Sequence, residues 1–151
     1  MKKLLILAAV LAAGVAANAA SFKWSAANIY AYGSTTDKYS GSVSLYAAGI
    51  EDALSTVTAS SGAVAATTFS NDSLVAGNSY DFYFVLEDSG MEFTSATVTK
   101  SAQATSTVNI AFGNMTTQTQ NTSNWAAVPE PTSGLLLILG MAGLALKRKR
   151  A

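Results

Sequence analysis

Apolar side chains recur at every second position in four separate stretches of the chain. The stretches are residues 22–32, 39–47, 80–86 and 106–112. Successive side chains of a β-strand point to opposite faces, so this period predicts strands with one buried face. Clusters of Gly, Ser, Asn and Asp between the stretches predict turns. The sequence therefore predicts a mainly β fold, an antiparallel sandwich of six or seven short strands.

A second pattern concerns the start of the third stretch. The spacing of Leu74, Gly77 and Tyr80 resembles the tyrosine corner of Greek-key sandwiches, in which a tyrosine hydroxyl bonds to upstream backbone. We therefore expect Leu74 and Tyr80 to be buried, and we predict an immunoglobulin-like or jelly-roll-like sandwich. The alternation also predicts that six side chains meet in one core. They are Phe82, Phe84, Leu86, Val108, Ile110 and Phe112.

One segment departs from the period of two. Ile50, Ala53, Leu54 and Val57 have the spacing of one face of a helix, which predicts one short helix over residues 50–57. Further along, residues 86–93 are typical of a hairpin that leads into a Thr-rich strand at 93–100.

The two ends of the chain differ from its middle. Lys2 and Lys3 precede an apolar run at residues 4–15, and small residues Ala17 and Ala19 follow it. This arrangement predicts a signal peptide over residues 1–19, cleaved after Ala19 by signal peptidase during export. A permanent anchor is the alternative, but the apolar run is short for one and ends in small residues.

The last 24 residues, 128–151, combine three features in a fixed order. The triplet Pro129, Glu130 and Pro131 holds both prolines of the chain, an apolar segment follows at residues 132–146, and four cations end it. The cations are Lys147, Arg148, Lys149 and Arg150. Prolines hold the triplet extended. The apolar segment predicts a transmembrane helix of marginal length, whose basic stop stays in the cytoplasm.

This order of triplet, span and basic end resembles the PEP-CTERM sorting signal of Gram-negative bacteria. The resemblance is confined to the tail. It implies recognition and removal of the tail by an exosortase, a membrane-embedded cysteine protease, with the inner membrane as a transient location. It further implies delivery to the cell surface or extracellular matrix. An ordinary C-terminal anchor is the alternative.

Between the two ends we predict an exported β-domain at residues 20–113 and a flexible stalk at 114–127, which is rich in Gln and Asn and lacks a period. Residues 20–128 contain three lysines and eight acidic residues, a net charge of 3 − 8 = −5. This balance argues against a nucleic-acid partner. The chain has no cysteine and no histidine, which excludes disulfides and the commonest general base and metal ligand.

Three groups of side chains could carry chemistry. Glu87, Asp88 and Glu92 flank a turn and are more typical of solubilising residues than of a glycosidase pair or a calcium loop. Phe22, Trp24, Tyr30 and Tyr32 could stack on sugars as a platform, although alternating aromatics more often build a core. The 32 Ser and Thr among residues 21–127 could carry O-linked sugar, although β-propensity also explains them.

We therefore expect a non-enzymatic, exported surface or matrix protein with no catalytic residues, no cofactor and no bound metal. The alternative function is a carbohydrate-binding module displayed at the surface, with extracellular polysaccharide as its partner.

Overall fold

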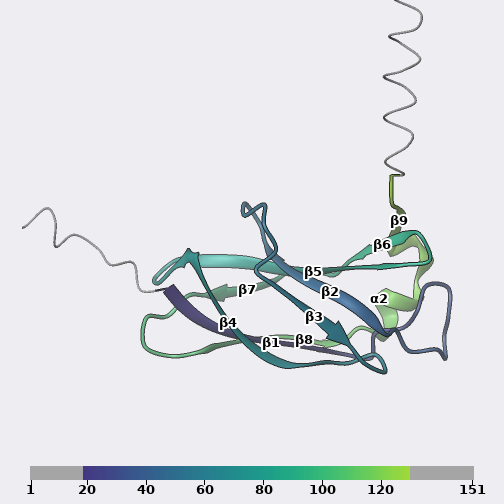
Figure 1. The fold of residues 1–151 in the computed structure, drawn as a ribbon, viewed down its shortest axis with the longest axis horizontal. Helices are drawn as coiled ribbons and strands as arrows, with labels where there is room; N and C mark the ends of the chain where they lie inside the picture. The colour runs from purple at the N-terminus through teal and green to yellow at the C-terminus, as the bar shows by residue number, and fades with distance from the viewer. Residues whose placement is uncertain (1–18, 130–151) are drawn as a thin grey trace, which may run out of the picture.

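Two β-sheets face each other in the part of the chain that the computed structural model describes, residues 19–129 (Figure 1). These residues include nine strands, one short α-helix and one 3-10 turn. In chain order they are β1 (Ala19–Ala27), β2 (Gly41–Ala47), β3 (Ser55–Ala59), β4 (Val64–Val75), β5 (Ser79–Asp88), β6 (Met91–Thr94), β7 (Val98–Ser101), β8 (Val108–Asn114), α2 (Thr116–Gln120), the 3-10 turn (Thr122–Asn124) and β9 (Trp125–Ala127).

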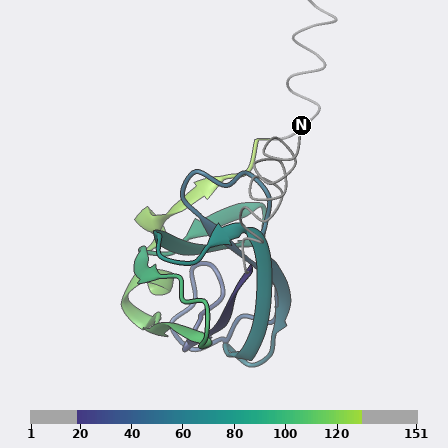
Figure 2. The same cartoon turned by 90° about the vertical axis from the view of Figure 1, so that its left-hand side faces the viewer.

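The smaller sheet has the strand order β4-β1-β8, and the larger has the order β3-β2-β5-β6-β9, with β7 also paired to β5. Viewed from the side, the strands curve around a shared interior (Figure 2). The pairs are antiparallel except for β1 and β8, which run parallel. The prediction of an antiparallel sandwich is wrong for this pair. The chain crosses from β7 in the larger sheet to β8 in the smaller one, so no tight hairpin sets the direction of β8.

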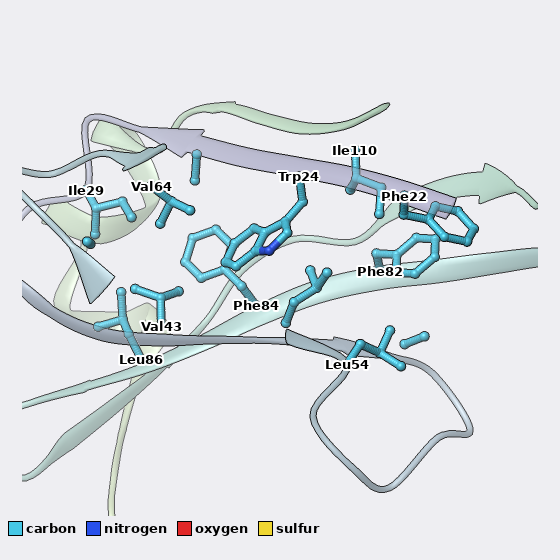
Figure 3. Close-up of a cluster of buried hydrophobic side chains, with 14 of the residues drawn as sticks. Phe22, Trp24, Ile29, Val43, Leu54, Val64, Phe82, Phe84, Leu86 and Ile110 are labelled. Atoms are coloured by element: carbon cyan, nitrogen blue, oxygen red, sulfur yellow. The ribbon is translucent and has the colours of Figure 1, made fainter. Parts of the chain in front are cut away.

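The core confirms the period of two. β1 contributes Phe22 and Trp24, β5 contributes Phe82 and Phe84, and all four are fully buried. Their rings meet between the sheets, with centroids 5.1 Å apart for Phe22 and Phe82 and 6.3 Å apart for Trp24 and Phe84 (Figure 3). The predicted six-residue core also forms. Leu86 and Ile110 are buried with the two Phe residues of β5, and Val108 and Phe112 pack against the cluster while partly exposed.

The predicted helix at residues 50–57 is wrong. Residues 55–59 form β3 instead, and Leu54 is the buried residue before it, with its N–H bonded to the Leu45 carbonyl at 2.8 Å. The run Thr56, Val57 and Thr58 is β-branched and favours a strand, which outweighs four apolar residues at helical spacing. The one α-helix of the described residues is α2, at a different place in the chain.

The tyrosine corner predicted between β4 and β5 is confirmed in part. The Tyr80 hydroxyl accepts a hydrogen bond from the Val75 N–H at 2.8 Å and donates to the Ser73 carbonyl at 3.3 Å. Leu74 is fully buried. Tyr80 itself is only half-buried, so the expectation that both side chains are buried is wrong for the tyrosine.

The predicted hairpin after β5 is confirmed. Ser89 and Gly90 form a two-residue turn with φ values of 54° and 75°, as the primed hairpin turns require. The Thr-rich strand predicted at 93–100 is divided in two. Ser95 lies between β6 and β7, where its hydroxyl accepts a hydrogen bond from the Phe84 N–H at 3.0 Å.

The interpretation of residues 114–127 as a flexible stalk is wrong. These residues include α2, the 3-10 turn and β9, which pairs with β6. Trp125 is buried, with its ring centroid 5.3 Å from that of Phe93 and 5.3 Å from that of Tyr32. α2 and β9, with five and three residues, are too short to show a period in the sequence. The buried Trp125 ring packs them onto the domain. The packed domain therefore extends to β9.

Within residues 19–129, no helix is long and apolar enough to cross a membrane. The predicted transmembrane segment at 132–146 lies outside the described residues.

Candidate functional site

The predicted sorting triplet begins almost directly after the last strand of the domain. β9 pairs antiparallel with β6, with Trp125 opposite Phe93 and Ala127 opposite Met91. The next residue, Val128, donates its N–H to the Gly90 carbonyl at 3.1 Å. Pro129 follows and is exposed. Thus only Val128 separates the folded sheet from the first proline. Glu130, Pro131 and the cations at 147–150 lie outside the described residues.

A buried hydroxyl fixes the segment that leads to this point. Thr119 on α2 is fully buried, and its hydroxyl donates to the Met115 carbonyl at 2.9 Å and accepts from the Tyr30 N–H at 3.2 Å. The Trp125 ring N–H donates to the Thr119 carbonyl at 3.0 Å. Hydrogen bonds therefore fix the chain on both sides of the 3-10 turn, at Thr119 before it and at Trp125 after it. A tryptophan within a polar run was the signal for this anchor in the sequence.

The predicted signal-peptide cleavage point lies within the central strand of the smaller sheet. Ala19 is the first residue of β1 and pairs with Val75, while the Ala20 side chain is fully buried. Ala17 lies outside the described residues. A cut after Ala19 would thus leave a mature chain whose first side chain belongs to the core.

The aromatic platform, the less favoured of the two interpretations, does not form. Phe22 and Trp24 are fully buried, and the Trp24 ring N–H donates to the Ser55 hydroxyl at 3.1 Å. The Tyr30 ring lies beneath Lys38, whose Nζ is 3.5 Å from the ring centroid, and the Tyr32 ring packs on Trp125. These four residues therefore present no shared exposed face for a sugar, because the alternation that aligned two of them turns them into the core.

The three carboxylates near the hairpin have separate positions. Glu87 and Glu92 lie directly opposite each other on β5 and β6. Asp88 accepts a hydrogen bond from the Tyr32 N–H at 2.8 Å and another from the Ser89 hydroxyl at 3.1 Å, so it holds the loop before β2 against the turn. In residues 19–129, no group of three or more acidic side chains is placed to hold a metal ion.

Tyr39 connects this hairpin to β2. Its hydroxyl donates to the Ser42 carbonyl at 2.9 Å and lies 3.2 Å from the Glu87 carbonyl. Burial raises the pKa of the Tyr39 hydroxyl, and the negative charges of Asp88 and Glu87 raise it further. The phenol therefore stays protonated and keeps its donor role.

The outer face of the larger sheet carries an aromatic pair that sequence reasoning missed. Tyr46 on β2 lies opposite Tyr83 on β5, and their rings stack with centroids 5.6 Å apart and planes 15° apart. Both are half-buried. Their positions in the alternating pattern could have revealed the pair. Tyr46 lies between buried Leu45 and Ala47, and Tyr83 lies between buried Phe82 and Phe84. An aromatic residue out of phase with a buried run points to solvent.

A hollow of about 500 Å³ lies next to this pair. It runs over β2 and β5 from Tyr46 toward the Ser89 turn, and its lining includes Ser42, Ser44, Val85, Glu87 and Glu92. The Ser44 hydroxyl is bonded to that of Thr56 at 2.9 Å, which extends the polar surface onto β3.

Comparison with known proteins identifies the tail. Residues 127–150 match the family model of the PEP-CTERM protein-sorting motif, which confirms the resemblance stated above. The motif implies export to the cell surface and processing by exosortase-like machinery. The match starts at the last residue of β9 and leaves the β-domain without an assigned family. No curated protein and no solved structure matches the chain.

Proposed function

We propose that this chain is a non-enzymatic component of the cell surface or extracellular matrix, delivered there by processing of its PEP-CTERM tail. The observation that carries the proposal is the sorting motif at residues 127–150, attached to a packed β-domain that ends where the motif begins. The domain would be the cargo, and the tail would direct its export.

The route has two processing steps. Signal peptidase would cut after Ala19 as the export machinery moves the chain across the inner membrane. Residues 132–146 would then hold the precursor in that membrane, with the cations at 147–150 on the cytoplasmic side. An exosortase-like protease would read Pro129, Glu130 and Pro131 outside the cytoplasm and release the domain.

The position of β9 limits how that protease can approach. Proteases bind several extended residues, and β9 pairs with β6 up to Ala127, one residue before Val128 and two before Pro129. The cut would therefore lie beyond the first proline, or β9 would have to leave the sheet first. Proline keeps the exposed residues extended in either case.

A structural role suits the chemistry of the domain. The chain has no histidine and no cysteine, and Asp88 is engaged in holding a loop. Glu87 and Glu92 lie on neighbouring strands of a sheet face.

We also propose that the fold belongs to the immunoglobulin-like or jelly-roll-like sandwiches, a classification supported by the Tyr80 corner.

The test replaces Pro129, Glu130 and Pro131 by three alanines in the native host. The change removes the stiff extended geometry and the carboxylate, so we expect uncut precursor to accumulate in the inner membrane. Fractionation followed by intact mass measures location and both cut positions. The matched control places three alanines at residues 105–107, in the exposed loop between β7 and β8. Equal shortening and export of the triplet variant would instead support an ordinary anchor.

A further inference from the structure

The stacked pair of Tyr46 and Tyr83 needs a reason, because it places two large rings on a solvent-facing side of the sheet. Inside the sandwich such rings are buried by the opposite sheet, but Tyr46 and Tyr83 alternate with the buried residues of β2 and β5 and so point to the outer face. The rings cover each other instead and remain half-exposed. Stacking restricts both rings, so less side-chain freedom is lost when a ligand binds.

The hollow beside the pair combines one aromatic wall with polar groups. Tyr46 closes one end, and the hydroxyls of Ser42 and Ser44 lie along β2. The carboxylates of Glu87 and Glu92 lie on the far side. Hydroxyls donate and accept hydrogen bonds, whereas carboxylates accept them. A ligand that fits must offer an apolar face for the ring and many hydroxyl groups for the rim.

We propose that this hollow is a binding site for a neutral carbohydrate chain. A pyranose ring presents C–H groups on one face, which pack on an aromatic ring, and hydroxyls around its edge, which pair with serine and carboxylate oxygens. The volume of about 500 Å³ holds a few sugar units.

Charge and topology argue against two other ligand classes, anionic polymers and extended peptides. None of the lining residues is Lys or Arg, and three are Glu87, Asp88 and Glu92, so an anionic polymer would be repelled. β2 and β5 are paired on both sides, so their backbone groups are not free to bind an extended peptide as an added strand.

The inference deepens the proposed function by naming the chemical class of the surface partner. It rests on that function only for where the protein meets the polysaccharide. Binding is measured with purified protein, so it is independent of the tail, and failure of the triplet experiment would leave this site untouched.

The experiment uses the full chain in a detergent without a sugar headgroup, immobilised and titrated with neutral β-linked glucan, mannan and galactan oligomers. A uronic acid oligomer of equal length is the anionic comparison. We expect saturable binding to at least one neutral oligomer and none to the uronate. Tyr46→Ala should weaken it at least about 10-fold, and Tyr46→Phe, which keeps the ring, less than about 3-fold.

Two further variants guard against misfolding. Ser42 is exposed, so Ser42→Arg fills the hollow without touching the core and should abolish binding at an unchanged thermal midpoint. Tyr30→Ala removes a half-buried tyrosine that does not line the hollow. This variant should bind the neutral oligomer as the parent does. Absence of binding to all three neutral oligomers, or equal affinity of Tyr46→Ala and Ser42→Arg with the parent, would overturn the proposal. Recovery of shortened oligomers would overturn it too, since it would make the hollow a hydrolase site.

Discussion

β1 and β9 are the first and the last strand of the domain, and the structure holds them in very different ways. β1 has nine residues and lies between β4 and β8 in the centre of its sheet. β9 has three residues and lies at the end of the larger sheet, paired with β6 alone. β1 buries four side chains, Ala20, Phe22, Trp24 and Ala26, and β9 buries one, Trp125.

The difference would suit the processing proposed for each neighbouring segment. The predicted signal-peptide cut falls after the first residue of β1, a strand that is packed into the core, so we expect that cut before β1 has paired. The sorting motif begins at the end of a strand that pairs with β6 alone, and we expect this strand to open more easily than β1, because local opening costs less at a sheet edge than at its centre. The first strand of the domain is thus held by two neighbouring strands, and the last strand by one.

The strongest test of the comparison is Trp24→Ala. This change opens a large cavity beside Phe84 and Phe112 and leaves the Ser55 hydroxyl without its partner. We expect the free energy of unfolding to fall by about 3–5 kcal/mol, measured by urea denaturation. Lys23→Ala, one residue away and exposed, should stay within about 0.5 kcal/mol of the parent. A loss below about 1 kcal/mol for Trp24→Ala would mean that β1 is not central to stability.

Trp125→Ala tests the other end and should have a smaller global effect. The change removes the ring from Phe93 and Tyr32 and the hydrogen bond to Thr119. We expect about 1–3 kcal/mol of lost stability, since only one short strand and α2 depend on this ring. Hydrogen exchange should show β9 and α2 losing protection while β1 and β5 keep theirs.

The control for this variant is Thr122→Ala in the adjoining turn, where the side chain is exposed. It should leave exchange unchanged. If Trp125→Ala instead lowers protection throughout the domain as much as Trp24→Ala does, the two ends are not different and β9 belongs to the central core.

Periodicity allowed much of this fold to be predicted. β1, β2, β5 and β8 show one buried and one exposed face, so the burial of Phe22, Phe84 and Ile110 follows from their phase alone. The same signal failed for α2 and β9, which have five and three residues and are too short to repeat a period. It also failed at residues 50–57, where Ile50, Ala53, Leu54 and Val57 have helical spacing but residues 55–59 pair with β2 as β3.

Other features depend on pairing between distant residues. The parallel register of β1 and β8 joins Trp24 to Ile110 and has no local sequence mark. The candidate carbohydrate site is similar, because Tyr46 and Tyr83 become neighbours only through the register of β2 and β5. The sorting motif is the opposite case. Its triplet, apolar segment and basic end are contiguous, so the sequence alone was sufficient to recognise it.

The finest test concerns the last hydrogen bond of the domain, from the Val128 N–H to the Gly90 carbonyl. Val128→Pro removes this donor, while Val128→Ala keeps it and serves as the matched control. Loss of one such bond at an edge should cost about 0.5–1.5 kcal/mol, the smallest effect of the three. If the closed end of β9 limits access of an exosortase-like protease, pulse-chase labelling in the native host should show faster loss of the precursor for the proline variant than for the alanine variant. Equal rates would mean that the protease already reaches its residues with β9 in place, so the loose end of the domain would have no part in processing.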